Sequence, residues 1–155
     1  MSKAHSFSTP RPSIDSSATI ACQKFCKEQG IGDPDAFIKS FEVYSNGFEN
    51  ACNLNRDLGW EFGEDKELPQ DFIDDLDSLV WSIDDQHHKA VLKWSEENPA
   101  TPLPIGTRVS FNYLKNKGVE GEITEVMDGH RYVINQDNYS LGYPIVAFEN
   151  VTIVQ

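Results

Sequence analysis

Between residues 72 and 94, apolar side chains recur every three or four positions, which is the repeat of one face of an α-helix. Pro69 stands just before this stretch, where a proline is well tolerated, and Pro99 bounds its far end. The pattern predicts one long helix that buries a stripe made of Phe72, Ile73, Leu76, Leu79, Val80, Ile83, His87, Ala90, Val91 and Trp94.

Shorter helices are expected before this long one. Ser16 and Ser17 offer an N-cap for a first helix, and Gly30 is a natural C-terminal stop. Asp33 and Pro34 then restart the chain as N-cap and first helical residue.

A further helical face follows that restart, with Gly47 as the weak point where it can break into two helices. Its members recur at helical spacing, and they are Phe37, Phe41, Tyr44, Phe48, Cys52 and Leu58.

Beyond Pro104 the sequence repeat changes to two residues. Asp128-Gly129 predicts a tight hairpin between the second and third of five short strands. Five strands within about fifty residues favour a small SH3-like barrel, because closure leaves no exposed edge. The strands are expected over residues 107–113, 121–127, 131–135, 143–146 and 151–154, with a tight turn over 147–150.

The predicted fold class is therefore α+β, with a helical N-terminal region followed by a small C-terminal SH3-like β-barrel. We divide the chain into a flexible arm (1–14), an acidic helical domain (15–97), a Pro-rich linker (98–104) and the barrel (105–155). A chain of 155 residues with 39% apolar residues can bury one modest core plus a satellite barrel. It has no apolar run long enough for a membrane span and no apolar segment typical of a secretory signal.

The three cysteines predict the redox setting. Cys22 and Cys26 are one helical turn apart, which suits two buried residues on one helix face and not a disulfide. An odd number of cysteines without a CxxC pair indicates reduced thiols, so we expect a cytoplasmic location.

The net charge of -12 is concentrated in one part of the chain. The remainder of the chain has 14 acidic and 12 basic residues and is nearly neutral. The acidic part, residues 57–85, repels phosphates and anionic membranes, and it attracts basic proteins. It carries -10 with Lys66 as its one base, and its eleven acids are Asp57, Glu61, Glu64, Asp65, Glu67, Asp71, Asp74, Asp75, Asp77, Asp84 and Asp85.

The C-terminal third, roughly residues 106–151, contains GTRV at Gly106, EGEI at Glu120 and YPIVAFENV from Tyr143. In these motifs it resembles the plasmid-borne type II dihydrofolate reductases, SH3-like barrels that assemble as tetramers around one pore. The resemblance implies the barrel fold and an origin on a mobile genetic element.

The same resemblance speaks against reductase activity. The Val-Gln-Ile-Tyr stretch that lines the family's pore is replaced here by Ser140, Leu141, Gly142 and Tyr143. The glutamine that holds cofactor and folate is thus a leucine, and the position of the pore lysine falls close to Phe111.

Catalytic and metal-binding motifs are missing elsewhere in the sequence. The cluster of Asp84, Asp85, His87 and His88 is the only metal-like one, and a di-metal site in a helical bundle needs two such motifs with further carboxylates. We interpret it as a solvated helix face with His87 at the core margin. No GxSxG, phosphate-binding glycine loop or HExxH motif occurs, so we expect no enzyme, no metal and no cofactor.

Together these features predict a non-catalytic acidic binding protein. It would be an inhibitor, or an immunity or counter-defence protein of phage or plasmid type, that blocks a basic nucleic-acid-handling partner by mimicking nucleic-acid charge. The expected contact residues are Asp71, Asp74, Asp75, Asp77, Asp84, Asp85, Tyr113, Tyr132 and Tyr143.

Two alternatives stay open. The barrel could be an adaptor that binds a peptide or single-stranded nucleic acid, or the chain could be a diverged pore-type reductase. The charge argues against membrane binding and against direct binding of nucleic acid, and a homo-oligomer is compatible with the sequence.

Overall fold

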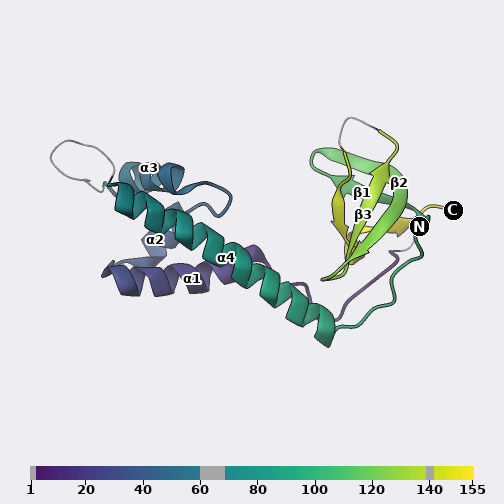
Figure 1. Ribbon diagram of the computed structural model, residues 1–155, viewed down its shortest axis with the longest axis horizontal. Coiled ribbons are helices and arrows are strands. Elements are labelled where there is room, and N and C mark those ends of the chain that lie inside the picture. The colour runs from purple at the N-terminus through teal and green to yellow at the C-terminus, as the bar shows by residue number, and fades with distance from the viewer. Residues whose placement is uncertain (1–2, 60–68, 139–141) are drawn as a thin grey trace. The chain divides into compact units, whose positions relative to one another are not determined.

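The computed structural model describes residues 3–59, 69–138 and 142–155, which form two compact units (Figure 1). The helical unit comprises residues 12–90, and the sheet unit comprises the residues up to Arg11 together with Val91–Gln155. This division differs from the predicted boundary at residues 98–104. Residues 3–11, which we call the arm from here on, and the last turns of the long helix, from Val91, belong with the sheet.

The helical unit contains α1 (Ile14–Gln29), α2 (Pro34–Ser40), α3 (Gly47–Leu58) and the part of α4 (Gln70–Glu97) that ends at Ala90. Gly30 ends α1 with a left-handed φ of 70°, and the Asp33 side chain caps α2, both as predicted. The start of α1 was predicted wrongly, because Ser13 and not Ser16 or Ser17 is its N-cap.

The predicted apolar face over residues 37–58 is interrupted by a non-helical segment at 41–46, and its middle is exposed to solvent. Tyr44 and Phe48 are 87% and 56% exposed, and Cys52 is exposed as well. A capping box at Asn46 starts α3 in a new rotational phase, so this helix buries Gly47, Asn50, Ala51 and Leu54 instead.

The predicted apolar stripe of α4 forms part of the core of the helical unit. Ile73, Leu76, Leu79 and Ile83 are buried there, which confirms the stripe over this part of α4. They pack with buried residues of the other helices, including Ala18, Ala21, Cys22, Phe25, Cys26, Phe37, Phe41, Ala51 and Leu54. Burial raises the pKa of the Cys22 thiol to about 12, so this thiol stays protonated at neutral pH.

The sheet unit contains a curled antiparallel sheet (Figure 1). Its strand order is β4-β3-β2-β1-β5. Its strands are β1 (Arg108–Tyr113), β2 (Asn116–Met127), β3 (Arg131–Gln136), β4 (Ile145–Ala147) and β5 (Thr152–Ile153), and the 3-10 turn η2 (Phe148–Asn150) precedes β5. The α+β class is thus confirmed as helices followed by a curled sheet. The second strand begins earlier than predicted, at Asn116.

The core of the sheet unit includes Val109, Phe111, Ile123, Tyr132, Ile134, Val146, Phe148 and Val151. Residues from both predicted connecting segments pack against it. Ala4 and Phe7 come from the predicted flexible arm, and Ala100 and Leu103 come from the predicted linker. Among the described residues, no helix is long and apolar enough to cross a membrane.

Candidate functional site

The side of α4 that faces away from the core of the helical unit carries acidic residues around an exposed tryptophan. Trp81 is 76% exposed in the middle of this helix. Asp77 precedes it by four residues, and Asp84 and Asp85 follow it by three and four, so carboxylates on the adjacent turns flank the ring. We call Asp71, Asp74, Trp81, Asp84 and Asp85 the acidic face. Asp75, which was also predicted to contact a partner, is nine residues from Asp84 and so lies on the opposite flank of α4, where it lines a hollow beside α1.

Most carboxylates of the acidic face have no basic partner. Asp85 pairs with Lys89 at 2.7 Å, and Asp74 accepts a hydrogen bond from the Gln70 amide at 2.8 Å. Within the described part of the chain, the other two carboxylates of the face, Asp71 and Asp84, make neither a hydrogen bond nor an ion pair. One exposed pair between residues i and i+4 contributes only a few tenths of a kcal/mol, so the face keeps most of its negative charge.

Asp77 stabilises the fold, which sets it apart from the other predicted contact residues. Its Oδ1 accepts the backbone N–H of Gly47 at 2.5 Å. Gly47 is the first residue of α3, where the N–H group has no acceptor within its own helix. The prediction that Asp77 contacts a partner stays a prediction, and one of its two carboxylate oxygens is already engaged within the fold.

Almost all of the net negative charge of the chain lies in the helical unit. Residues 12–90 contain 17 acidic and 6 basic residues, a net charge of -11, and the rest contains 8 acidic and 7 basic residues, a net charge of -1. Part of this charge, over residues 61–67, lies outside the described residues.

The three predicted tyrosine contacts differ in exposure. Tyr132 is 0% exposed, so the prediction that it contacts a partner is wrong for the structure as it stands. Tyr113 is half-buried against the sheet core, and Tyr143 is 66% exposed. Ser140 and Leu141 of the predicted pore stretch lie outside the described residues.

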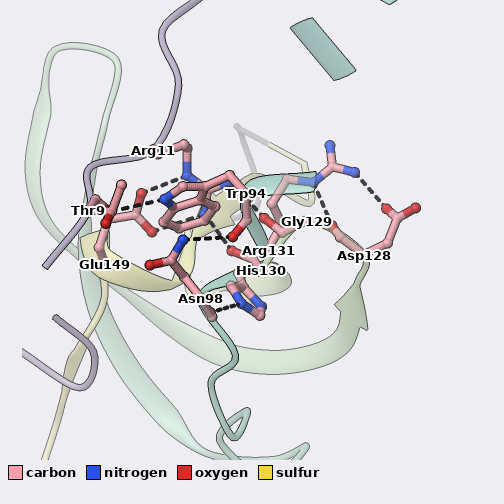
Figure 2. Close-up of polar contacts among 9 residues, drawn as sticks. All are labelled: Thr9, Arg11, Trp94, Asn98, Asp128, Gly129, His130, Arg131 and Glu149. Atoms are coloured by element: carbon pink, nitrogen blue, oxygen red, sulfur yellow. Dashed lines mark hydrogen bonds and ion pairs between the residues drawn. The ribbon is translucent and has the colours of Figure 1, made fainter. Parts of the chain in front are cut away.

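A second cluster lies within the sheet unit, around the guanidinium group of Arg11 (Figure 2). The Nε and Nη2 atoms donate to the two Glu149 carboxylate oxygens at 2.6 and 3.0 Å. Nη1 donates to the carbonyl of Gly129 at 2.6 Å, and Nη2 also donates to the carbonyl of His130 at 2.9 Å. The guanidinium carbon lies 4.7 Å from the centre of the Trp94 ring. We call Glu149, Trp94 and these two carbonyl groups the arginine site.

Two residues of the arginine site are held in place by further hydrogen bonds. The Trp94 indole N–H donates to the carbonyl of Thr9 at 3.0 Å (Figure 2). The His130 Nε2 atom donates to the carbonyl of Asn98 at 2.7 Å, and the Asn98 side-chain amide donates to the carbonyl of Trp94 at 2.9 Å. The end of α4, the β2–β3 turn and the arm therefore fix one another.

The aromatic residues of the arm extend this cluster. His5 stacks on Phe148 with ring centres 4.7 Å apart. Phe7 stacks on His130 at 5.5 Å and meets the Trp94 ring edge-on at 4.8 Å.

The contacts with Arg11 keep Glu149 ionised. Burial raises the pKa of Glu149, but the hydrogen bonds and the charge of Arg11 outweigh it and hold that pKa below its ordinary value. Burial lowers the pKa of His5, the charge of His130 lowers it further, and Glu149 opposes both effects. His5 is therefore neutral when the arm is packed at neutral pH.

We expect the packing of the arm to weaken as the pH falls below 6.5, the ordinary pKa of His5. The packed arm binds fewer protons than a free arm, so its stability is complete above pH 6.5 and declines as the pH falls towards the lowered pKa. The other groups that face His5 are His130, Tyr132 and Glu149. The pKa of Tyr132 is raised and that of Glu149 is lowered, so neither group changes its protonation near pH 6.

Hydrogen-exchange protection factors of residues 3–11 at pH 8 and pH 5.5 measure this effect. The matched control is His5→Gln, which keeps a polar side chain near Tyr132 but cannot titrate. Equal protection of the wild-type arm at both pH values would contradict the prediction, and an equal loss in His5→Gln would assign the effect to another group.

Two features of these sites were missed by sequence reasoning. Trp81 had a usable signal, because it lies on the side of the long helical repeat opposite the apolar stripe. Arg11 and Glu149 are 138 positions apart, and no local pattern links them.

Among the described residues, no three His, Cys, Asp or Glu side chains are grouped so that they could hold a metal ion, and this includes the Asp84–His88 region. Comparison of the chain with models of protein families, with curated proteins and with solved structures finds no match.

Proposed function

We propose that this chain is a non-catalytic acidic binding protein that engages a basic macromolecular partner through the acidic face of α4. The observation that supports this is the 76% exposure of Trp81 among carboxylates that mostly lack partners. An exposed tryptophan contributes little to the fold, whereas tryptophan is enriched among the residues that dominate binding energy. The surrounding charge would select a positively charged partner and speed up association.

The type of partner follows from the arrangement of the charges. Carboxylates that recur along the outer side of one helix can take the place of nucleic-acid phosphates. We therefore propose a nucleic-acid-handling protein as the target, and a setting of inhibition, immunity or counter-defence of phage or plasmid type. The sheet unit is proposed to be an SH3-like barrel that stays open between β4 and β5, in line with the resemblance of its motifs to the type II dihydrofolate reductases.

Two charge-matched triple variants test this function. Asp71→Asn, Asp74→Asn and Asp84→Asn remove three charges from the acidic face. Glu120→Gln, Glu122→Gln and Glu125→Gln remove three charges from exposed positions of β2 in the sheet unit. The probe is protamine, an arginine-rich DNA-binding protein, and the measurement is calorimetric titration at low and at moderate salt.

We expect the α4 triple variant to weaken protamine binding about tenfold or more, and the β2 variant to weaken it by less than about threefold. Trp81→Ala is expected to weaken binding about tenfold while it leaves the salt dependence nearly unchanged, because it removes apolar contact and not charge. Equal losses in the two triple variants would show that only net charge matters, and this would contradict a defined site. Wild-type affinity in Trp81→Ala would exclude the ring from the interface.

A further inference from the structure

We propose that the sheet unit is a receptor for an extended peptide that carries an aromatic residue and, four positions later, an arginine. In the free protein the chain's own arm, residues 3–11, occupies this receptor through Phe7 and Arg11. The inference goes beyond the acidic face, because it concerns the other unit and a ligand of different chemistry.

The arginine site binds every nitrogen atom of a guanidinium group. Four hydrogen bonds of 2.6 to 3.0 Å reach Glu149 and the two carbonyls, and the Trp94 ring covers the group. The side chains of Arg11 and Glu149 are only 18% and 25% exposed. This planar, two-sided set of acceptors matches arginine and not the single ammonium group of lysine.

An aromatic slot lies beside the arginine site. Phe7 packs against His130 and Trp94, which are also components of the arginine site. The two side chains are therefore bound by one continuous surface, and their spacing in the sequence is part of what that surface recognises.

The arm also pairs with the edge of the sheet through its backbone. Lys3 forms an antiparallel bridge with Thr152 of β5, and the Ala4 N–H donates to the carbonyl of Val151 at 3.3 Å. Strand β5 is an edge of the sheet order, where an added segment finds free backbone groups. Backbone pairing at an edge, together with pockets for particular side chains, is how many domains bind extended peptides.

The arm is built so that a second peptide can take its place. The arm contains no helix and no strand, and every contact that packs it against the rest of the sheet unit is noncovalent. A tethered ligand competes at an effective concentration in the millimolar range, so the arm masks the receptor from weak ligands. A hollow of about 460 Å³ adjoins His130 and Phe148, and its apolar lining of Leu92, Ala100, Pro102, Val126 and Met127 offers a longer ligand additional contacts.

The experiment uses the full chain with Phe7→Ala and Arg11→Ala, which empties the receptor, and a fluorescent peptide of residues 3–13 as the probe. Anisotropy titration should show that the peptide binds this variant at least about tenfold more tightly than it binds the wild-type chain, in which the arm competes. The single variant Arg11→Ala serves as a milder substitute if the double variant is not folded by circular dichroism.

Two peptide controls test the specificity. A peptide with Arg11→Lys keeps its charge but loses the planar fork, and a peptide with Phe7→Ala loses the aromatic contact. Each is expected to bind about tenfold more weakly or worse. Equal binding of the Arg11→Lys peptide would overturn the inference, as would failure of the unmodified peptide to bind a folded variant.

A last comparison separates this receptor from the acidic face, to which a basic peptide could also bind. Glu149→Gln in the emptied chain should abolish peptide binding, and the α4 triple variant should leave it unchanged. The reverse result would assign the peptide to the acidic face and overturn the proposed receptor. Neither result depends on whether protamine binds at α4.

Discussion

Gly47→Ala is expected to destabilise the helical unit by roughly 2 to 4 kcal/mol, because the new methyl group would collide with the backbone of α4. A Cβ atom at this position would lie 2.9 Å from both the Cγ and the backbone N of Asp77, and it would also overlap the carbonyl oxygen of Ile73. The clash would also disturb the hydrogen bond from the Gly47 N–H to Asp77. The clash can be relieved only if α3 moves away from α4, and this movement would open the core around Ala51 and Leu54.

Gly32→Ala is the matched control, since it lies in the same unit and a Cβ atom there meets nothing within 4 Å. Its effect should stay within about 0.5 kcal/mol. Denaturant unfolding followed by far-ultraviolet circular dichroism measures both variants, because the helices provide most of this signal. Equal stability of the two variants would contradict the close approach of α3 and α4 at Gly47.

Gly47 also shows which features of the fold can be predicted from local sequence and which cannot. The long helix, the stop at Gly30 and the restart at Asp33 and Pro34 were predictable, because each depends on residues a few positions apart. Gly47 was predicted to be a break in a helix, and it is the first residue of α3. The sequence shows the absence of a side chain there, but not the passage of a second helix that makes the absence necessary.

The candidate sites also differ in whether local sequence could predict them. The acidic face was predictable, since its residues are close in the sequence and most are exposed as a helical repeat implies. Tyr132 was misplaced because an alternating strand pattern does not show which of its two faces is buried. The arginine site was not predictable at all, because it depends on packing between a segment near residue 11 and a turn near residue 149.

Tyr132→Ala is the second substitution from which we expect a large effect, a loss of about 3 to 5 kcal/mol in the stability of the sheet unit. The ring is 0% exposed and stacks on Phe148 with ring centres 4.2 Å apart. Its hydroxyl accepts the N–H of Leu103 at 2.7 Å and lies 2.9 Å from the His5 Nε2 atom. Removal of the side chain thus leaves a cavity and also frees contacts of two segments that pack on the sheet.

Tyr132→Phe separates these contributions, because it keeps the ring and removes only the hydroxyl. We expect it to cost about 1 to 2 kcal/mol, since the Leu103 N–H loses its acceptor, and to increase hydrogen exchange in residues 3–11, since His5 loses its partner. Tyr143→Phe, at a ring that is 66% exposed, should change neither quantity measurably. Unchanged exchange of the arm in Tyr132→Phe would mean that the arm is held by the arginine site and ring stacking alone, and that its pH response does not pass through the contact between His5 and Tyr132.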